Sequence, residues 1–279
     1  MSPAIVALVL LAAVLHASWN ALLKGSGDRR WMTIVMQLTS MVAAGVVTLF
    51  LPLPALRSWP WLVAGATLHI GYSVFLVRAL SLGELGEIYP ISRGASPVMV
   101  TAGAAIAAGD HVSMRQLIAI AVVSAGIISL RRGEGRRLPL AAILTALGTA
   151  AFTACYTITD GLGARQSGNV AAYIAWLWVL DGVFVGGWFI FARRSERGAR
   201  PTLKQTIIGA AGGLVSMVAY SAIILATTLG ALGAVSALRE TSVLFAAVIG
   251  AVFLGERLTP GRLAACIAIA VGSFFIAVA

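Results

Sequence analysis

Long apolar runs follow one another along almost the whole chain, and they restrict the folds that it can adopt. Of the 279 residues, 59% are hydrophobic and only 11% are charged. A soluble domain could not bury this much apolar surface, whereas a helix of about 20 apolar residues matches the hydrocarbon core of a bilayer. Backbone amides inside lipid must find hydrogen bonds within the protein, which favours helices. The sequence therefore predicts an all-α polytopic membrane protein.

Windows of about 20 residues predict ten transmembrane helices in this chain. Polar segments rich in glycine, proline or arginine separate them, among them KGSGDRR, RRGEGRR, DGLGARQSGN and TLGALG. The first run has no basic segment before it and no small-residue cleavage site after it, so we interpret it as a span and not as a signal peptide. The predicted spans are residues 3–23, 31–51, 60–80, 87–107, 114–130, 139–159, 170–192, 206–227, 232–253 and 261–278.

Positive charges lie mainly in alternate loops. The net charge is +10, which in a soluble protein would suggest nucleic acid, but here it follows the orientation rule for membrane insertion, and we expect no nucleic-acid partner. The odd-numbered loops hold fourteen cations, namely Lys24, Arg29, Arg30, Arg131, Arg132, Arg136, Arg137, Arg193, Arg194, Arg197, Arg200, Lys204, Arg257 and Arg262. The even-numbered loops hold three, namely Arg57, Arg115 and Arg165. Because cationic loops stay in the cytoplasm, we expect a multi-pass protein of the cell (inner) membrane with both termini outside.

Two arginines lie inside predicted spans and are related by an internal repeat. Arg93 stands in ISRGASPVMV before GDHVSMRQL, and Arg239 stands in ALRETSVLFA before GERLTPGRL, with the same spacing from arginine to the Gly-acid pair. A cation at hydrocarbon depth costs roughly 2.5–3.5 kcal/mol on the insertion scale, so it usually marks a functional site. Its occurrence at two equivalent positions strengthens that interpretation.

The repeat extends over both halves of the chain. SLGELGEI at 81–88 aligns with TLGALGAV at 228–235, and Tyr72-Ser73 aligns with Tyr220-Ser221. This divides the chain into residues 1–133 and 134–279, each with five predicted spans. Because five is odd, the second half must cross the membrane in the opposite direction. Two inverted five-helix repeats are a common architecture of secondary transporters, with the substrate site between the halves.

With these motifs the chain resembles the drug/metabolite transporter superfamily, in particular its EamA-like ten-helix members. The segment LGERLTPGRLAACIAIAVGSFFI near the C-terminus carries the resemblance, and AGDHVSMRQLIAIAVVSAGIISL repeats it in the first half. Pro97 stands where the family often has a proline in its fourth span. The first-half copy departs from the usual Gly-Glu, because it has Asp110-His111. The resemblance implies the fold and a transport function, with export favoured, and it leaves the substrate open.

Polar and aromatic side chains recur at helical spacing on several predicted spans, and they should face the protein interior because lipid does not tolerate them. Tyrosines and tryptophans in spans can also be interfacial anchors, and serines and threonines can be packing contacts. Among these side chains we expect a small-molecule site lined by Arg93, Arg239, Tyr72, Tyr220, Trp19, Asn20, Tyr156, Trp176 and Tyr89.

The two arginines have two possible roles. A planar guanidinium fork suits a carboxylate or phosphonate, and an internal ion pair that locks helices is equally compatible with the pattern. Counting from the span ends places each arginine roughly 10–12 Å deep, on opposite sides of the midplane, one toward each mouth. Glu240 follows Arg239 directly and should point about 100° away on a helix, so we expect no ion pair between them. The counter-charge of Arg93 would come from Asp181, Glu87, Asp160 or a bound anion.

Four side chains are candidates for proton coupling. Asp181 and Glu240 are carboxylates inside predicted spans, and His16 and His69 titrate in the useful range or serve as hydrogen-bonded structural groups. We interpret Asp110 and Glu256 as structural, capping the next helix or anchoring a loop. Cys155 and Cys266 lie in apolar segments without metal-ligand spacing, and we expect no disulfide, metal or cofactor.

These observations favour a secondary active transporter and not an enzyme. Its substrate would be a small anionic or zwitterionic metabolite such as an amino acid or organic acid, moved by alternating access with proton coupling or exchange, in a monomer or homodimer. No phosphate-binding loop supports ATP-driven transport. The alternatives are a flippase for lipid carriers, which would need a groove open to lipid, and a membrane-embedded lipid-modifying enzyme, which would need clustered catalytic side chains.

Overall fold

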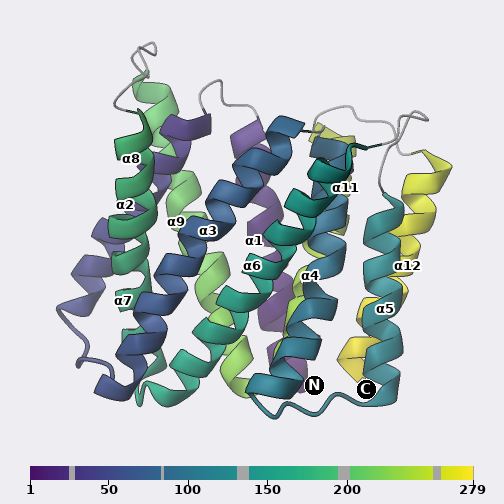
Figure 1. Ribbon diagram of the computed structural model, residues 1–279, viewed down its shortest axis with the longest axis horizontal. Helices are drawn as coiled ribbons and strands as arrows, with labels where there is room; N and C mark the ends of the chain where they lie inside the picture. Colours follow the sequence, from purple (N-terminus) through teal and green to yellow (C-terminus); the bar gives the residue numbers. More distant parts are fainter. Residues whose placement is uncertain (25–28, 83–84, 131–137, 194–201, 254–258, 279) are drawn as a thin grey trace.

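A computed structural model of the protein describes residues 1–24, 29–82, 85–130, 138–193, 202–253 and 259–278, and the described part is helical with no strand (Figure 1). The elements are α1 (Pro3–Lys24), α2 (Arg29–Thr48), η1 (Leu56–Ser58), α3 (Trp59–Leu82), α4 (Leu85–Ala107), α5 (Met114–Ser129), α6 (Leu140–Gln166), α7 (Val170–Asp181), η2 (Gly182–Gly186), α8 (Gly187–Arg193), α9 (Leu203–Leu229), α10 (Leu232–Arg239), α11 (Ser242–Phe253) and α12 (Pro260–Val278). The all-α prediction is confirmed.

A helix or a set of consecutive helices lies in each of the ten predicted ranges. By length and composition, four segments of the described residues are long and apolar enough to cross a membrane, and they are Trp31–Thr48, Leu140–Gln166, Leu203–Leu229 and Leu232–Ile249. Four shorter apolar helices, at Pro3–Trp19, Met114–Ser129, Val170–Gly186 and Leu263–Val278, accompany them. That all ten segments span the bilayer stays a prediction.

Two of the predicted spans are interrupted helices. The seventh consists of α7, the π-helical turn η2 and α8, and the π-helix begins directly after Asp181. The ninth breaks after α10, where the backbone amides of Glu240 and Thr241 bond the carbonyls three residues earlier, and α11 starts at Ser242. No glycine or proline stands at this break, so composition alone could not have located it.

The sixth helix is longer than predicted. The segment DGLGARQ was expected to form a loop, but α6 continues through it to Gln166. Its two glycines are buried under other helices, because a side chain at Gly161 would meet Leu232 and one at Gly163 would meet Tyr173. Tertiary packing therefore overrides the low helix propensity of glycine here. The helix ends before Gly168, whose φ of 71° lies in the left-handed region.

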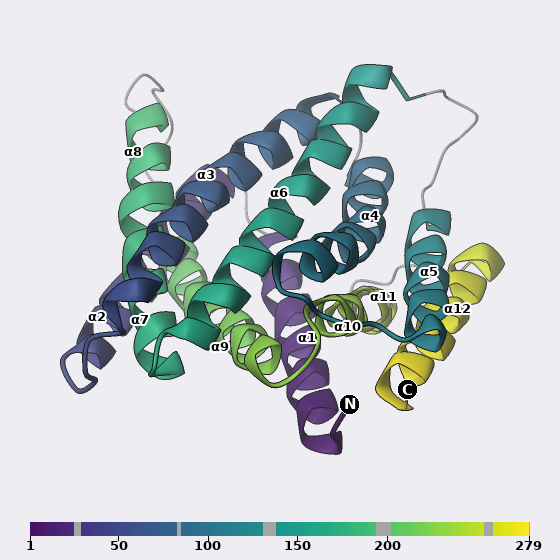
Figure 2. The same cartoon turned by 60° about the horizontal axis from the view of Figure 1, so that its bottom comes forward.

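The helices pack so that α3 lies on α6 and α9 lies on α1, while α5 packs on α12 and α2 on α7 (Figures 1 and 2). The largest buried apolar cluster joins α1, α5, α9, α10 and α12 around Val9, Val123, Val235 and Ile269. The short helix α10 lies at its centre, and all eight of its residues are buried. Segments from both ends of the chain thus share one core, and α10 is fixed within it.

Candidate polar site between the helices

Both arginines predicted from the repeat contact one carboxylate. Nη1 of Arg93 donates to Oε1 of Glu240 at 3.3 Å, and Nε and Nη2 of Arg239 donate to the same oxygen at 3.3 and 3.2 Å. Glu240 is fully buried, Arg239 is 3% exposed and Arg93 is 8% exposed. Nη2 of Arg93 also lies 2.5 Å from Nε2 of His16. We call Arg93, Arg239, Glu240 and His16 the arginine cluster.

Helix interruptions place the charged groups of this cluster. Pro90 and Pro97 flank Arg93 in α4, and Pro97 lacks the amide that would bond the carbonyl of Arg93 four residues before it. Arg239 ends α10, and Glu240 lies in the break before α11 with φ −69° and ψ −7°. A break of this kind lets two neighbouring side chains converge, which a continuous helix would prevent.

Two sequence-based expectations about the arginines are therefore wrong. Arg239 and Glu240 do form an ion pair, because the residue pair stands at a helix end and not inside a helix. The arginines do not face opposite mouths of the protein, because both guanidinium groups contact the same oxygen atom. The counter-charge of Arg93 comes from Glu240, which was not among the partners proposed for it.

A second polar cluster forms around His69 of α3. Nδ1 of His69 lies 2.8 Å from each carboxylate oxygen of Asp181, and Nε2 lies 3.5 Å from Oδ2 of Asp160. The hydroxyl of Tyr220 donates to the same oxygen of Asp160 at 2.6 Å. His69, Asp160 and Asp181 are all buried. These four residues, the carboxylate cluster, place one imidazole between two carboxylates.

Aromatic rings pack around the carboxylate cluster. The ring of Tyr156 lies 4.3 Å from that of His69 and stands edge-on to Tyr72 and Tyr220, with centroids 5.6 and 6.0 Å apart. The repeat-related tyrosines Tyr72 and Tyr220 thus both pack against Tyr156, and their role in binding a substrate stays a prediction.

The charges of the two clusters are complementary. The arginine cluster has two guanidinium groups for one carboxylate, and the carboxylate cluster has two carboxylates for one imidazole. Among the described residues, Oε2 of Glu240 and Oδ1 of Asp160 are buried oxygens without a hydrogen-bond partner. Oδ1 of Asp160 faces Gly65, whose missing side chain leaves room for it. Buried ionised oxygens normally have partners, so both clusters retain unused acceptor capacity.

The structure places the remaining predicted residues in different surroundings. Trp19 stands edge-on to His16 with ring centroids 5.0 Å apart. Nε1 of Trp19 lies 3.3 Å from Nδ1 of His16, on the opposite side of the ring from the nitrogen that Arg93 contacts. Trp176 packs on Trp59 beside an apolar cluster that includes Leu62. The side chains of Asn20 and Tyr89 lie outside the part that the structure describes.

Sequence reasoning missed two members of the site, Asp160 and Trp178. Asp160 stood in a polar stripe with Tyr156 but was not selected for the site, because α6 was expected to end one residue earlier. Trp178 contacts Tyr220 at 6.2 Å between rings, and its Nε1 donates to the hydroxyl of Ser221 at 3.1 Å. Trp178 is three residues before Asp181 and therefore shares its helix face, a signal that pointed to it instead of Trp176.

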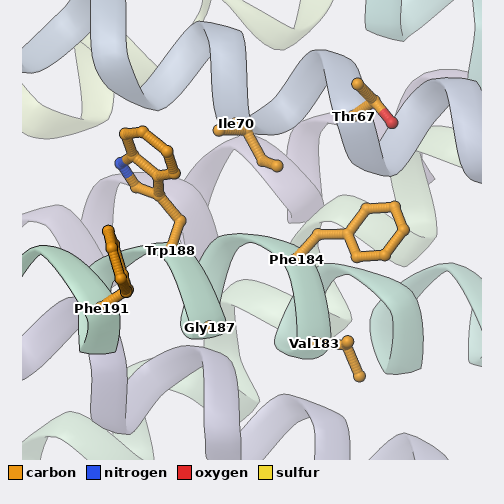
Figure 3. A pocket seen from close by; sticks show the side chains of 7 residues that line it. All are labelled: Thr67, Ile70, Val183, Phe184, Gly187, Trp188 and Phe191. Carbon is orange, nitrogen blue, oxygen red and sulfur yellow. The ribbon is translucent and has the colours of Figure 1, made fainter.

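The best-defined apolar hollow lies away from the charged groups. Figure 3 shows it between α3 and the η2–α8 segment, where Trp188 and Phe191 project beside Ile70. Its volume is about 420 Å³, and Thr67 is its only hydroxyl-bearing lining residue. That hydroxyl already donates to the carbonyl of Val63 at 2.7 Å. The residues that line the hollow include no charged side chain that could pair with a charged solute.

Comparisons with known proteins agree with this architecture. One crystal structure superposes over 100% of this chain and 98% of its own chain with a TM-score of 0.79, at 16% sequence identity. That identity supports a shared fold alone. No curated protein sequence matches the chain. The family model of the EamA-like transporter family matches residues 140–278. The protein is therefore a transmembrane transporter of the drug/metabolite type, and its predicted membership of the drug/metabolite transporter superfamily is confirmed through its EamA-like second half.

Proposed function

We propose that the chain is a secondary active transporter that exports a small anionic or zwitterionic metabolite, such as an amino acid or organic acid, by alternating access. The observation that carries this proposal is the pair of buried guanidinium groups sharing one oxygen of Glu240. Two cations with one carboxylate leave a net positive charge at the centre of the helices. A substrate carboxylate would compensate it through charge-assisted hydrogen bonds.

The fold supports a construction from two inverted halves of five spans each, residues 1–133 and 134–279. In Figure 1, α1 runs upward from the N-terminus and its counterpart α6 runs downward, and α5 and α12 are related in the same way. The packing between the halves repeats as well, because the contact of α3 with α6 corresponds to the contact of α9 with α1. Such a pseudo-symmetric pair of halves is the architecture on which alternating access is built.

The carboxylate cluster is the proposed site of proton coupling. His69 contacts Asp181 through one ring nitrogen and approaches Asp160 through the other. An imidazole between two carboxylates can take a proton from one and give it to the other. If the substrate is zwitterionic, its ammonium group would be attracted to this cluster while its carboxylate binds the arginines. Exchange of one solute for another is the alternative mode of coupling.

A flippase for lipid-linked substrates is less well supported. It would need a polar recognition group along an opening to lipid. The apolar hollow of α3 and α8 faces outward, but its single hydroxyl is already bonded within the helix (Figure 3). The paired arginines are buried, as a solute site enclosed by the helices requires. The same family assignment speaks against a lipid-modifying enzyme.

Ligand binding to purified protein tests the anion site directly. A ligand that binds only the native state increases the free energy of unfolding, by about 2.7 kcal/mol at a ligand concentration of 100 times Kd. The unfolding temperature rises accordingly. We expect members of a panel of amino acids and dicarboxylic acids to stabilise the wild type, and Arg239→Ala to abolish the effect while still inserting in the membrane. Arg115→Ala removes an exposed cation of α5 and is the matched control.

Proteoliposomes loaded with a stabilising ligand then test transport. We expect efflux from wild-type and Arg115→Ala vesicles, and none from Arg239→Ala vesicles. Equal efflux from all three would show that the arginine cluster is a structural ion pair and would refute the proposed site.

A further inference from the structure

A second ionic network joins the two halves far from the arginine cluster in the fold. Nη1 of Arg165, in the last turn of α6, donates to Oδ1 of Asp110 at 2.9 Å, and Nη2 lies 3.4 Å from Oδ2. Arg165 also donates to the carbonyls of Thr227 and Gly230 at 3.0 and 2.9 Å. Oδ2 of Asp110 accepts the backbone amide of Leu232 at 2.8 Å. One carboxylate and one guanidinium thus connect the α4–α5 loop to α6, to α9 and to the start of α10.

The network lies at one end of the molecule. The α4–α5 connection crosses the end at which both chain termini lie (Figure 1). Asp110 belongs to the first half, and its carboxylate bonds two residues of the second half, Arg165 and Leu232. The side chains are 11% and 27% exposed, for Asp110 and Arg165 respectively, so water can reach them when the halves move. A charge-assisted pair of this exposure is strong enough to hold an end closed and weak enough to break reversibly.

The helix α10 links this network to the arginine cluster. Asp110 bonds the first residue of α10, and Arg239 is its last. At 1.5 Å per residue, eight residues span roughly 11 Å, and burial on every side keeps the helix rigid. A side chain at Gly233 would meet the side chain and Cα of Thr101, so α10 also lies directly on α4. Any displacement of Leu232 along the helix axis must therefore move Arg239.

We propose that Asp110 and Arg165 form a latch that holds this end of the transporter closed and positions Arg239 through α10. This rests on the alternating-access function proposed above. Asp110 is a positioning residue, because it acts on Arg239 and does not contact the substrate. Opening the latch frees the N-terminus of α10, moves Arg239 away from Arg93 and releases the solute at this end. Closing it rebuilds the site.

Pulsed electron spin resonance distances test the latch without any substrate. Spin labels on Met114→Cys and Ala171→Cys report the latch end, because both residues are exposed, one in each half, and neither contacts the network. Labels on Leu82→Cys and Leu203→Cys report the opposite end, with Cys155 and Cys266 replaced by alanine. Asp110→Asn can still accept the amide of Leu232 but loses the ionic pair. In Asp110→Asn we expect the ratio of molecules with long 114–171 distances to molecules with short ones to rise about tenfold. The 82–203 distances should not lengthen.

Arg165→Gln breaks the same pair from the other partner and serves if Asp110→Asn does not fold. Arg115→Gln removes one cation from the same end and should leave both distances unchanged. Unchanged 114–171 distances in both latch variants would overturn the proposal, and equal lengthening at both ends would show general loosening and overturn it too. If the latch opens as expected but no ligand stabilises the wild type, the proposed substrate class is wrong and the latch stands.

Discussion

Glu240 is the carboxylate that both buried arginines contact. Its Oε1 accepts three guanidinium contacts, from Arg93 and Arg239 together, while its Oε2 has no hydrogen-bond partner among the described residues. Removing one partner from a buried charge network typically costs about 3–5 kcal/mol, because it leaves the other charges uncompensated. Glu240 therefore stabilises the empty site and also competes with a bound anion for the same donors.

Two carboxylate substitutions should separate substrate binding from proton coupling. Asp181→Asn removes the closer carboxylate partner of His69 and should leave stabilisation by a dicarboxylic acid intact while abolishing proton movement with the solute. Glu240→Gln removes the competing charge and should tighten binding of an anionic ligand by roughly tenfold, since the arginines lose a charged partner. Ligand-induced thermal shifts and a pH-sensitive dye in the vesicle lumen measure the two properties. Proton movement that persists in Asp181→Asn would exclude this carboxylate as carrier.

The sequence predicted part of the site at the residue level. The repeat located Arg93 and Arg239, and polar stripes located Tyr72, Tyr156 and Tyr220, because buried polar groups stand out in an apolar chain. It could not assign Glu240 to both arginines. That pairing depends on a helix break at residues 240–241, and no glycine or proline stands there to predict the break.

At the scale of the elements, close contact between helices depends on particular glycines. A side chain at Gly213 of α9 would come within 2.6 Å of the backbone oxygen of Met36 in α2. At the neighbouring Gly212 the nearest atom is the Met36 sulfur at 3.7 Å, an ordinary contact distance. The hydroxyl of Ser40 donates to the carbonyl of Gly213 at 3.1 Å, which fixes the two helices at this spacing. The contact between α2 and α9 therefore has room for a methyl group at Gly212 but not at Gly213.

Substituting these two glycines separately checks the helix packing. Gly213→Ala should destabilise the protein by about 1–3 kcal/mol because the backbones must move apart. Gly212→Ala gains up to about 1 kcal/mol of helix propensity without a clash, so its unfolding temperature should stay equal or rise. Thermal unfolding in one detergent compares them. Similar melting temperatures for both variants would contradict the packing described for α2 and α9.

Element boundaries were predicted unevenly. The ten helical ranges follow from hydropathy, because the apolar runs are long and their polar separators are distinct. The continuation of α6 through Gly161 and Gly163 was missed, since burial under Leu232 and Tyr173 is a tertiary effect. The π-helix after Asp181 leaves no signal in the periodicity either.

At the scale of the whole molecule, the charge distribution predicts which side each end faces. The latch end carries the even-numbered loops, which are poor in cations, and it should lie outside the cell. We expect Met114→Cys to react with an impermeant maleimide from outside and Leu203→Cys to react only after the cytoplasmic face is exposed, since both residues are exposed at opposite ends. The reverse pattern in intact cells would invert the topology and place both termini inside.

The oxygen of Glu240 shared between the two halves has a consequence for how an unloaded carrier returns. A pair of buried cations with nothing to neutralise them could not cross a low-dielectric barrier without a solute, and turnover would then require one cargo in each direction. In this protein the carboxylate of Glu240 balances one of the two positive charges, so the empty form can return with half of that charge compensated. A carrier equipped in this way is suited to net one-way discharge of its cargo.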